Sequence, residues 1–166
     1  MLSQDELVDG AVPENSTVLL REDVAGQRIW IDVMAVIDGD TFVARRGDRL
    51  YLMSLRDIEA PELEQPFGDA ARQRLAELVD GRRIVVRPAS EESCVFTVHA
   101  ETADRQDVSE RLLTEGFAWA TASASEQWRR LEQSTRVQRA GLWQSSAPEP
   151  PWEFRRRAGG ESGQRH

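Results

Sequence analysis

Residues 29–58 read IWIDVMAVIDGDTFVARRGDRLYLMSLRDI, and this stretch decides the fold. Apolar residues alternate with other residues over 29–37, which is the period-two pattern of a strand. Two further apolar runs, at 41–44 and 50–58, each follow a turn signal made of Asp and Gly. Three strands joined by tight turns within so short a stretch predict an antiparallel meander.

The rest of the chain alternates helical and strand patterns. The expected elements are a helix from Gly68 to Gly81, strands at 83–87 and 94–101 joined by a loop at 88–93, a short helix after Asp107 and a last helix at 125–140. Five short strands with a helix between the third and fourth predict a mainly β protein with helices, of the α+β class. The specific prediction is a five-stranded Greek-key barrel of the OB type with about three helices.

A chain of 166 residues is the size of one domain, and its 40% of apolar residues supply a sizeable core. Residues 1–25 show no clear period, and we interpret them as a flexible lead-in. Residues 26–144 are the expected folded domain. Residues 145–166 form a Pro- and Arg-rich tail, which we expect its prolines to keep extended.

Composition narrows the classes of function. The net charge of −8 argues against a domain that coats DNA by bulk attraction. No run approaches the roughly 18 apolar residues of a membrane span, and the acidic N-terminus lacks the pattern of a secretory signal. We therefore expect a cytoplasmic monomer, or a secreted or periplasmic protein if a leader has been removed. The single cysteine excludes an intrachain disulfide.

Acidic residues gather at two predicted turns, Asp38-Gly39-Asp40-Thr41 and Glu59-Ala60-Pro61-Glu62. A hard cation such as Ca²⁺ binds carboxylate and carbonyl oxygens. We expect Asp40, Glu59 and the Ala60 carbonyl to be its ligands, with Asp38 and Thr41 beside them. Glu62 is the candidate general base. Either motif alone is more typical of a hairpin turn with solvated charges, whereas the two together favour a cation site.

Several weak motifs also follow one another along the chain. They are VIDGDT at 36–41, APE at 60–62, QPFG at 65–68, EGFA at 115–118, AGLW at 140–143 and PPWEF at 150–154. Through them the chain resembles the staphylococcal-nuclease (thermonuclease) family over about residues 29–157. The resemblance implies a five-stranded OB barrel with three helices and a Ca²⁺-dependent phosphodiesterase ancestry, acting on DNA and RNA.

The resemblance also implies two arginines that this chain does not carry at the expected places. Ser54 stands eight residues before Glu62, where the first arginine is expected, and Phe96 stands near the second, counted back from Gly116. Glu59 replaces a shorter aspartate. Fixed guanidinium groups stabilise the charge that builds on phosphoryl oxygens during attack, and losing one such donor costs about 100- to 1,000-fold in rate. Phe96 is expected to make one wall of the pocket apolar, either stacking on a base or filling space.

Two hypotheses follow. The first is a nuclease homologue that is inactive or very weak and serves as a binding or scaffold domain, with an impaired Ca²⁺ site. The second is an active Ca²⁺-dependent endonuclease on DNA or RNA in which Arg56 replaces the arginine missing at Ser54, since both side chains leave one strand on the same face. The plain alternative for Arg56 is a surface ion pair with Asp57.

The expected partner is single-stranded DNA or RNA, bound weakly, and an unknown protein partner is the other possibility. The basic surface for nucleic acid is expected from the arginines of the C-terminal part, where the charge is most positive. These are Arg129, Arg130, Arg136, Arg139 and Arg155–Arg157.

Overall fold

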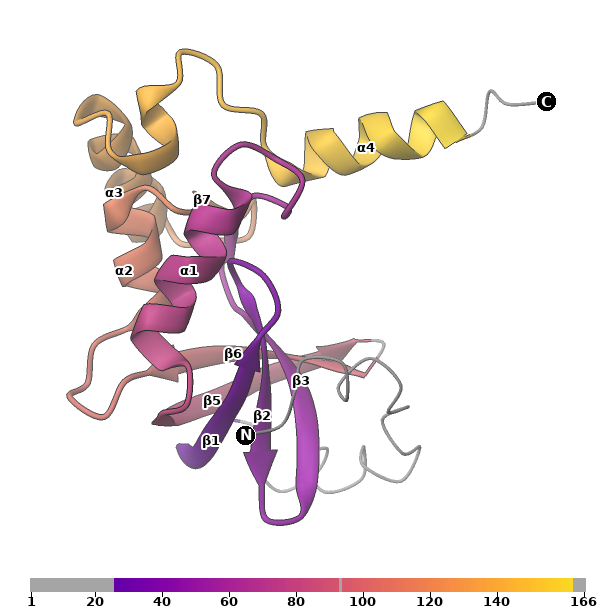
Figure 1. The fold of residues 1–166 in the computed structure, drawn as a ribbon. Coiled ribbons are helices and arrows are strands. Elements are labelled where there is room, and N and C mark those ends of the chain that lie inside the picture. Colours follow the sequence, from indigo (N-terminus) through magenta and orange to yellow (C-terminus); the bar gives the residue numbers. More distant parts are fainter. Residues whose placement is uncertain (1–25, 93, 163–166) are drawn as a thin grey trace.

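The computed structural model of the chain describes residues 26–92 and 94–162 (Figure 1). Five strands close into a barrel in the order β1-β2-β3-β6-β5. They are β1 (Ile29–Val36), β2 (Thr41–Arg46), β3 (Arg49–Leu55), β5 (Arg83–Glu92) and β6 (Val95–Glu101). All neighbouring strands are antiparallel except β3 and β6, which are parallel. The predicted α+β fold with a five-stranded barrel is confirmed.

The barrel closes because alternate side chains point inward and form one core. In β1 the inward residues Ile29, Ile31 and Val33 are buried, while Trp30 and Asp32 between them reach the outer surface. Phe42 and Met53 continue the core in β2 and β3. Burial of such side chains is the main force that holds a barrel of this size together.

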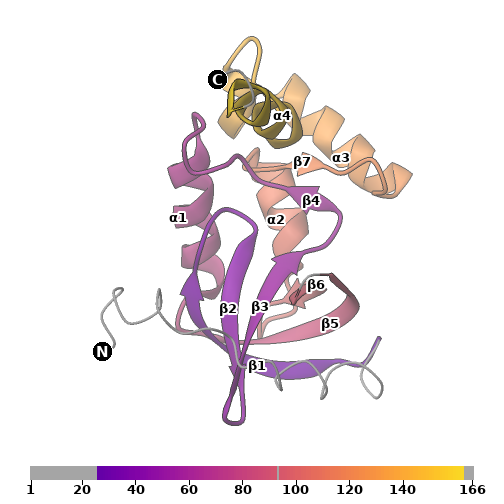
Figure 2. The same ribbon diagram turned by 90° about the vertical axis from the view of Figure 1, so that its right-hand side faces the viewer.

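Helices cover one end of the barrel. They are α1 (Gly68–Val79), α2 (Val108–Glu115), α3 (Glu126–Val137), a 3-10 helix (Gly141–Gln144) and α4 (Pro151–Ser162), with a small sheet of β4 (Ile58–Glu59) and β7 (Trp119–Ala120). Figures 1 and 2 both show α3 and α4 at the end of the barrel opposite the β2–β3 hairpin. No helix within the described ranges is long and apolar enough to cross a membrane.

Three expectations need correction. The predicted strand at 50–58 is two strands, because Asp57 adopts a left-handed conformation (φ 66°) and β4 leaves the barrel to pair with β7. The predicted loop at 88–93 is largely strand, since β5 continues to Glu92 through an irregularity in register between Pro88 and Ser90. A proline fits a strand at such a bulge, where a ladder hydrogen bond is already missing.

The tail was expected to be extended, but Pro151–Ser162 within it form the helix α4. Its last proline, Pro151, is the first helical residue, a position that needs no N–H donor and suits the fixed φ of proline. No proline follows within the helix. The predicted lead-in, residues 1–25, lies outside the described residues.

A second, smaller core attaches the tail to the body. Trp119, Leu142 and Trp143 are buried together, and Phe67 and Trp152 pack against them. The ring of Trp152 meets that of Trp119 edge to face at 6.4 Å between centroids. This aromatic contact, typical of stable packing, fixes the start of α4 near the β4–β7 sheet.

An ion pair joins α1 to α2. The Arg74 guanidinium donates to both carboxylate oxygens of Glu115, at 2.5 and 2.9 Å, and Arg111 also donates to Glu115. The hydrogen bonds from Arg74 hold the pKa of Glu115 below its usual value. A carboxylate with a lowered folded-state pKa contributes stability above its unfolded pKa, and this contribution is lost as the pH falls through the folded pKa.

Glu115→Gln is therefore expected to lower the free energy of unfolding at pH 7 by about 1 kcal/mol, because the pair is only partly shielded from water. The same variant should lose less stability than the wild type as the pH falls below the usual pKa of glutamate. Urea unfolding at pH 7 and at pH 3 measures both effects. Glu77→Gln is the control, since Glu77 is an exposed partner of the same Arg74. An equal loss of stability with falling pH in the wild type and in Glu115→Gln would contradict the stabilising role of the Arg74–Glu115 ion pair.

Candidate functional site

The turn between β1 and β2 is built by one carboxylate. Asp38 Oδ1 accepts hydrogen bonds from the backbone N–H groups of Asp40, at 3.0 Å, and Thr41, at 2.7 Å. This Asx-type turn replaces backbone pairing with a side-chain acceptor. It fixes the direction in which the Asp40 side chain leaves the strand end.

The Asp40 carboxylate lies against the loop that follows β4. Its Oδ2 accepts from the Ala60 N–H at 2.6 Å, and its Oδ1 accepts from the Thr41 hydroxyl at 2.9 Å. Burial, followed by the negative charge of Asp38, raises the pKa of Asp40 to about 7. The sequence-predicted approach of Asp40 to the 59–62 segment is therefore present in the fold.

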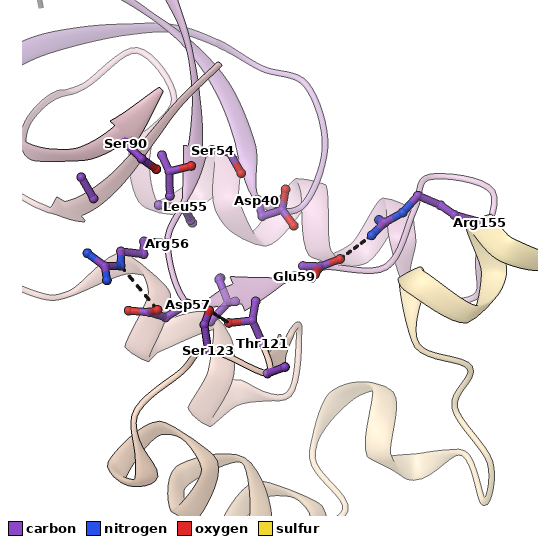
Figure 3. Close-up of a pocket in the computed structure, with 14 residues that line it drawn as sticks. Asp40, Ser54, Leu55, Arg56, Asp57, Glu59, Ser90, Thr121, Ser123 and Arg155 are labelled. Carbon is purple, nitrogen blue, oxygen red and sulfur yellow. Dashed lines mark hydrogen bonds and ion pairs between the residues drawn. The ribbon is translucent and has the colours of Figure 1, made fainter. Parts of the chain in front are cut away.

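The two glutamates of that segment are joined by an arginine from the far end of the chain. Arg155 of α4 donates through Nη2 to Glu59 Oε2, at 2.6 Å, and through Nη1 to Glu62 Oε1, at 2.5 Å. Figure 3 shows the Arg155 side chain reaching Glu59 from the helix. One guanidinium thus bridges two of the acids that the sequence placed at the site and offsets one of their two negative charges.

The segment that precedes α4 is held beside the same loop. The Gln65 side chain accepts from the Glu62 N–H at 2.8 Å and donates to the Glu149 carbonyl at 2.9 Å. Gln65 is buried, so these bonds are shielded from water. Together with the Trp152–Trp119 contact, they place Arg155 within reach of both glutamates.

A cavity of about 810 Å³ opens beside these groups. Its lining includes Asp40, Ser54, Arg56, Glu59 and Arg155. Figure 3 shows Arg56 and Arg155 on opposite sides, with Asp40 and Glu59 between them. Two guanidinium groups therefore line the cavity, that of Arg56 near Ser54 and that of Arg155 from the C-terminal part, which was expected to form a basic surface.

Arg56 forms the surface ion pair with Asp57 that was the alternative to a catalytic role. Its Nε lies 3.5 Å from Asp57 Oδ1, and its side chain is about half exposed. Its backbone carbonyl accepts from the Ser109 hydroxyl at 3.3 Å, which ties the end of β3 to α2. Arg56 is thus both a pocket-lining residue and one half of a local ion pair.

Phe96 does not form a wall of the pocket, so that interpretation is wrong. It is buried inside the barrel and meets Tyr51 edge to face at 5.7 Å. Because successive side chains of a strand point to opposite sides, it is the next residue of β6, Thr97, that lines the cavity. Thr97 is paired with Ser54 across β3 and β6, so small hydroxyl side chains occupy this wall.

The residues present supply the right kind of ligand for Ca²⁺, but their oxygens are not arranged around one point. Carboxylate and carbonyl oxygens are suitable donors, yet the oxygens of Asp40 already accept two hydrogen bonds, and both glutamates bind Arg155. Across 26–92 and 94–162, no three His, Cys, Asp or Glu side chains are placed to hold one metal ion. This arrangement therefore does not fit the ion unless Arg155 is displaced.

Comparison with known proteins agrees with this fold. The profile of the staphylococcal nuclease homologue family matches residues 52–145. Protein ParB of Escherichia coli is 34% identical over 138 residues, which cover 75% of this chain and 78% of that protein. The micrococcal nuclease of Shigella flexneri is 31% identical over 144 residues, 76% of this chain and 83% of that protein.

Some relatives are much longer. An uncharacterized 38.1 kDa protein of Capnoides sempervirens is 36% identical over 110 residues, which cover 65% of this chain. The matched segment spans about a third of that relative, 32% of its length. The profile match covers more than half of the chain, and the two bacterial relatives match most of their own length. The chain therefore belongs to the staphylococcal nuclease homologue family.

Proposed function

We propose that this nuclease-family domain binds single-stranded nucleic acid at the cavity beside Asp40 and cleaves phosphodiester bonds very weakly or not at all. The observation that carries the proposal is the Arg155 bridge between Glu59 and Glu62. Homologues named as nucleases support a phosphodiesterase ancestry. The engaged carboxylates support a low rate.

Two parts of the chemistry are weakened. A general base has to be positioned toward the water from which it takes a proton, whereas the Glu62 side chain is held by Arg155 through Oε1. The charge that develops on phosphate needs fixed cations facing it, whereas Ser54 is neutral and Arg56 lies beside Asp57. Each missing donor costs about 100- to 1,000-fold, so the expected residual rate is small.

The test is cleavage of fluorescently labelled single-stranded DNA and RNA by the purified protein in millimolar Ca²⁺. The expected result is a rate close to that of the buffer, and the same rate in Asp40→Ala. Binding of the same oligonucleotides in EDTA is measured in parallel. Rapid cleavage by the wild type that disappears in Asp40→Ala would contradict the proposal.

A second candidate function is an active phosphodiesterase that uses migrated arginines. The observation that favours it is that Arg56 and Arg155 both line the cavity that contains Asp40. Under this alternative, Arg56→Ala lowers the cleavage rate by at least about 100-fold.

Under our proposal, Arg56→Ala changes neither the small residual rate nor the fold. Arg72→Ala is the control, because Arg72 is another partly exposed arginine held by a neighbouring aspartate, on α1. A loss confined to Arg56→Ala would establish the second function in place of the first.

A further inference from the structure

The outer face of the barrel carries a basic hollow that is separate from the cavity beside Asp40. Four arginines line it together with Trp30 and Asp32. The arginines are Arg28, Arg45, Arg46 and Arg83. The hollow measures about 360 Å³ and lies over β1, β2 and β5. Figures 1 and 2 show β1 at the end of the molecule away from α3 and α4.

Strand register brings these residues together. Asp32 of β1 pairs with Arg45 of β2 on one side and with Arg83 of β5 on the other. Trp30 lies two residues before Asp32 and therefore on the same outer face. β5 lies far along the sequence from the β1–β2 hairpin, so the charge balance of any one segment does not reveal the patch.

The positive charge of the hollow is only partly compensated. Asp32 is shared by Arg45 and Arg83 at 3.9 and 4.0 Å, the outer limit of an ion pair. Arg28 pairs with Glu101 at 3.0 Å. Arg46 has no ion-pair partner among the described residues. Two carboxylates thus face four guanidinium groups in a protein whose total charge is −8.

The expected basic patch of the C-terminal part is weaker by comparison. There Arg136 forms an ion pair with Glu132, Arg157 with Glu149 and Arg130 with Glu126. Two of these pairs lie within α3, and the third joins α4 to the residues just before it in the tail. Their guanidinium groups are already matched by acids, as is that of Arg155. The arginines that remain, Arg129, Arg139 and Arg156, lie on α3, just after α3 and on α4, so their charge is spread over separate elements.

Trp30 gives the hollow a second feature. Its side chain is 48% exposed, and the Arg83 guanidinium lies 5.9 Å from the centre of its ring. An exposed indole face flanked by arginines is the combination that binds single strands, since bases stack on the ring and guanidinium groups contact phosphates. A peptide rich in acidic residues would use the arginines but not the indole face.

We propose that Trp30 and the surrounding arginines form a binding site for single-stranded nucleic acid, distinct from the cavity beside Asp40. The site contacts the strand by stacking on Trp30 and by phosphate contacts to Arg45, Arg46 and Arg83. It does not depend on a metal ion or on cleavage. A negative result for this site would therefore leave the proposed function unaffected, and a negative result for the proposed function would leave this site unaffected.

The test is equilibrium binding of a fluorescein-labelled oligo(dT) 12-mer to the full chain in EDTA, at several salt concentrations. Trp30→Ala is expected to weaken binding by at least about fivefold with little change in salt dependence. Arg45→Gln/Arg83→Gln is expected to weaken binding at about 50 mM salt by about tenfold. It should also reduce the slope of log K against log salt by about 1.4, because each phosphate that is no longer neutralised accounts for about 0.7.

Arg129→Gln/Arg130→Gln is the matched control, because it removes the same charge from the exposed face of α3. It is expected to change the affinity by no more than about twofold. Thermal unfolding verifies that each variant is folded. The proposal is overturned if the control weakens binding as much as the barrel-face variant does, if Trp30→Ala binds like the wild type, or if the wild type does not bind at low salt. Equal competition by poly-glutamate would assign the hollow to an acidic partner instead and would also overturn it.

Discussion

Gly39→Ala is expected to lower the free energy of unfolding by about 2 kcal/mol, the usual cost of forcing an extra methyl group into a packed site. A Cβ at Gly39 would lie 2.5 Å from Ala60 Cβ and 2.7 Å from Ala71 Cβ. Real Cβ atoms do not approach so closely, and both neighbours are short side chains that cannot rotate away. The turn itself has to move.

Asp40 directly follows Gly39, so the same displacement should weaken the hydrogen bond from the Ala60 N–H to the Asp40 carboxylate. Urea unfolding measures the stability, and amide exchange at Ala60 measures the contact. Gly159→Ala is the control, since nothing lies within 4 Å of that position. Gly39→Ala combined with Ala60→Gly removes the closer of the two clashes and should recover part of the loss. Wild-type stability in Gly39→Ala would contradict this packing.

Much of the barrel follows from local sequence patterns. The alternation over 29–37 and the Asp-Gly turn predict β1, β2 and their hairpin, because strand period and turn chemistry are local properties. The approach of Asp40 to the 59–62 segment was predictable for a similar reason. Asp40 ends the turn between β1 and β2, and the 59–62 segment follows soon after β3 of the same meander.

Other features depend on contacts that no local pattern contains. Arg155 and Glu62 are separated by 93 residues, and the position of α4 depends on how Trp152 packs on Trp119. The expectation that Phe96 forms a wall of the pocket failed because counting back from Gly116 takes no account of the direction in which each β6 side chain points. The basic hollow could not be predicted because Asp32 joins arginines from two different strands.

Arg155→Ala is expected to raise the affinity of the chain for Ca²⁺ by roughly tenfold, which is about 1.4 kcal/mol. The guanidinium makes two charge-assisted hydrogen bonds, to Glu59 and to Glu62. Each such bond is strong when shielded, but the Arg155 side chain is 53% exposed, so water reduces their value. A cation that binds these carboxylates has to displace Arg155 first, and the variant removes that competition.

Arg156→Ala is the matched control, because it removes the same side chain from the next position of the same exposed helix. Its affinity for Ca²⁺ should equal that of the wild type. A gain in both variants would mean that net charge, and not the bridge, governs binding.

The most direct measurement of the central claim, that Arg155 occupies the carboxylates of this nuclease-family site, is calorimetric titration of Ca²⁺ into the wild type, Arg155→Ala and Arg156→Ala at one ionic strength. The account predicts tighter binding in Arg155→Ala alone. Unchanged or weaker binding in Arg155→Ala, or no binding in any of the three proteins, would contradict it.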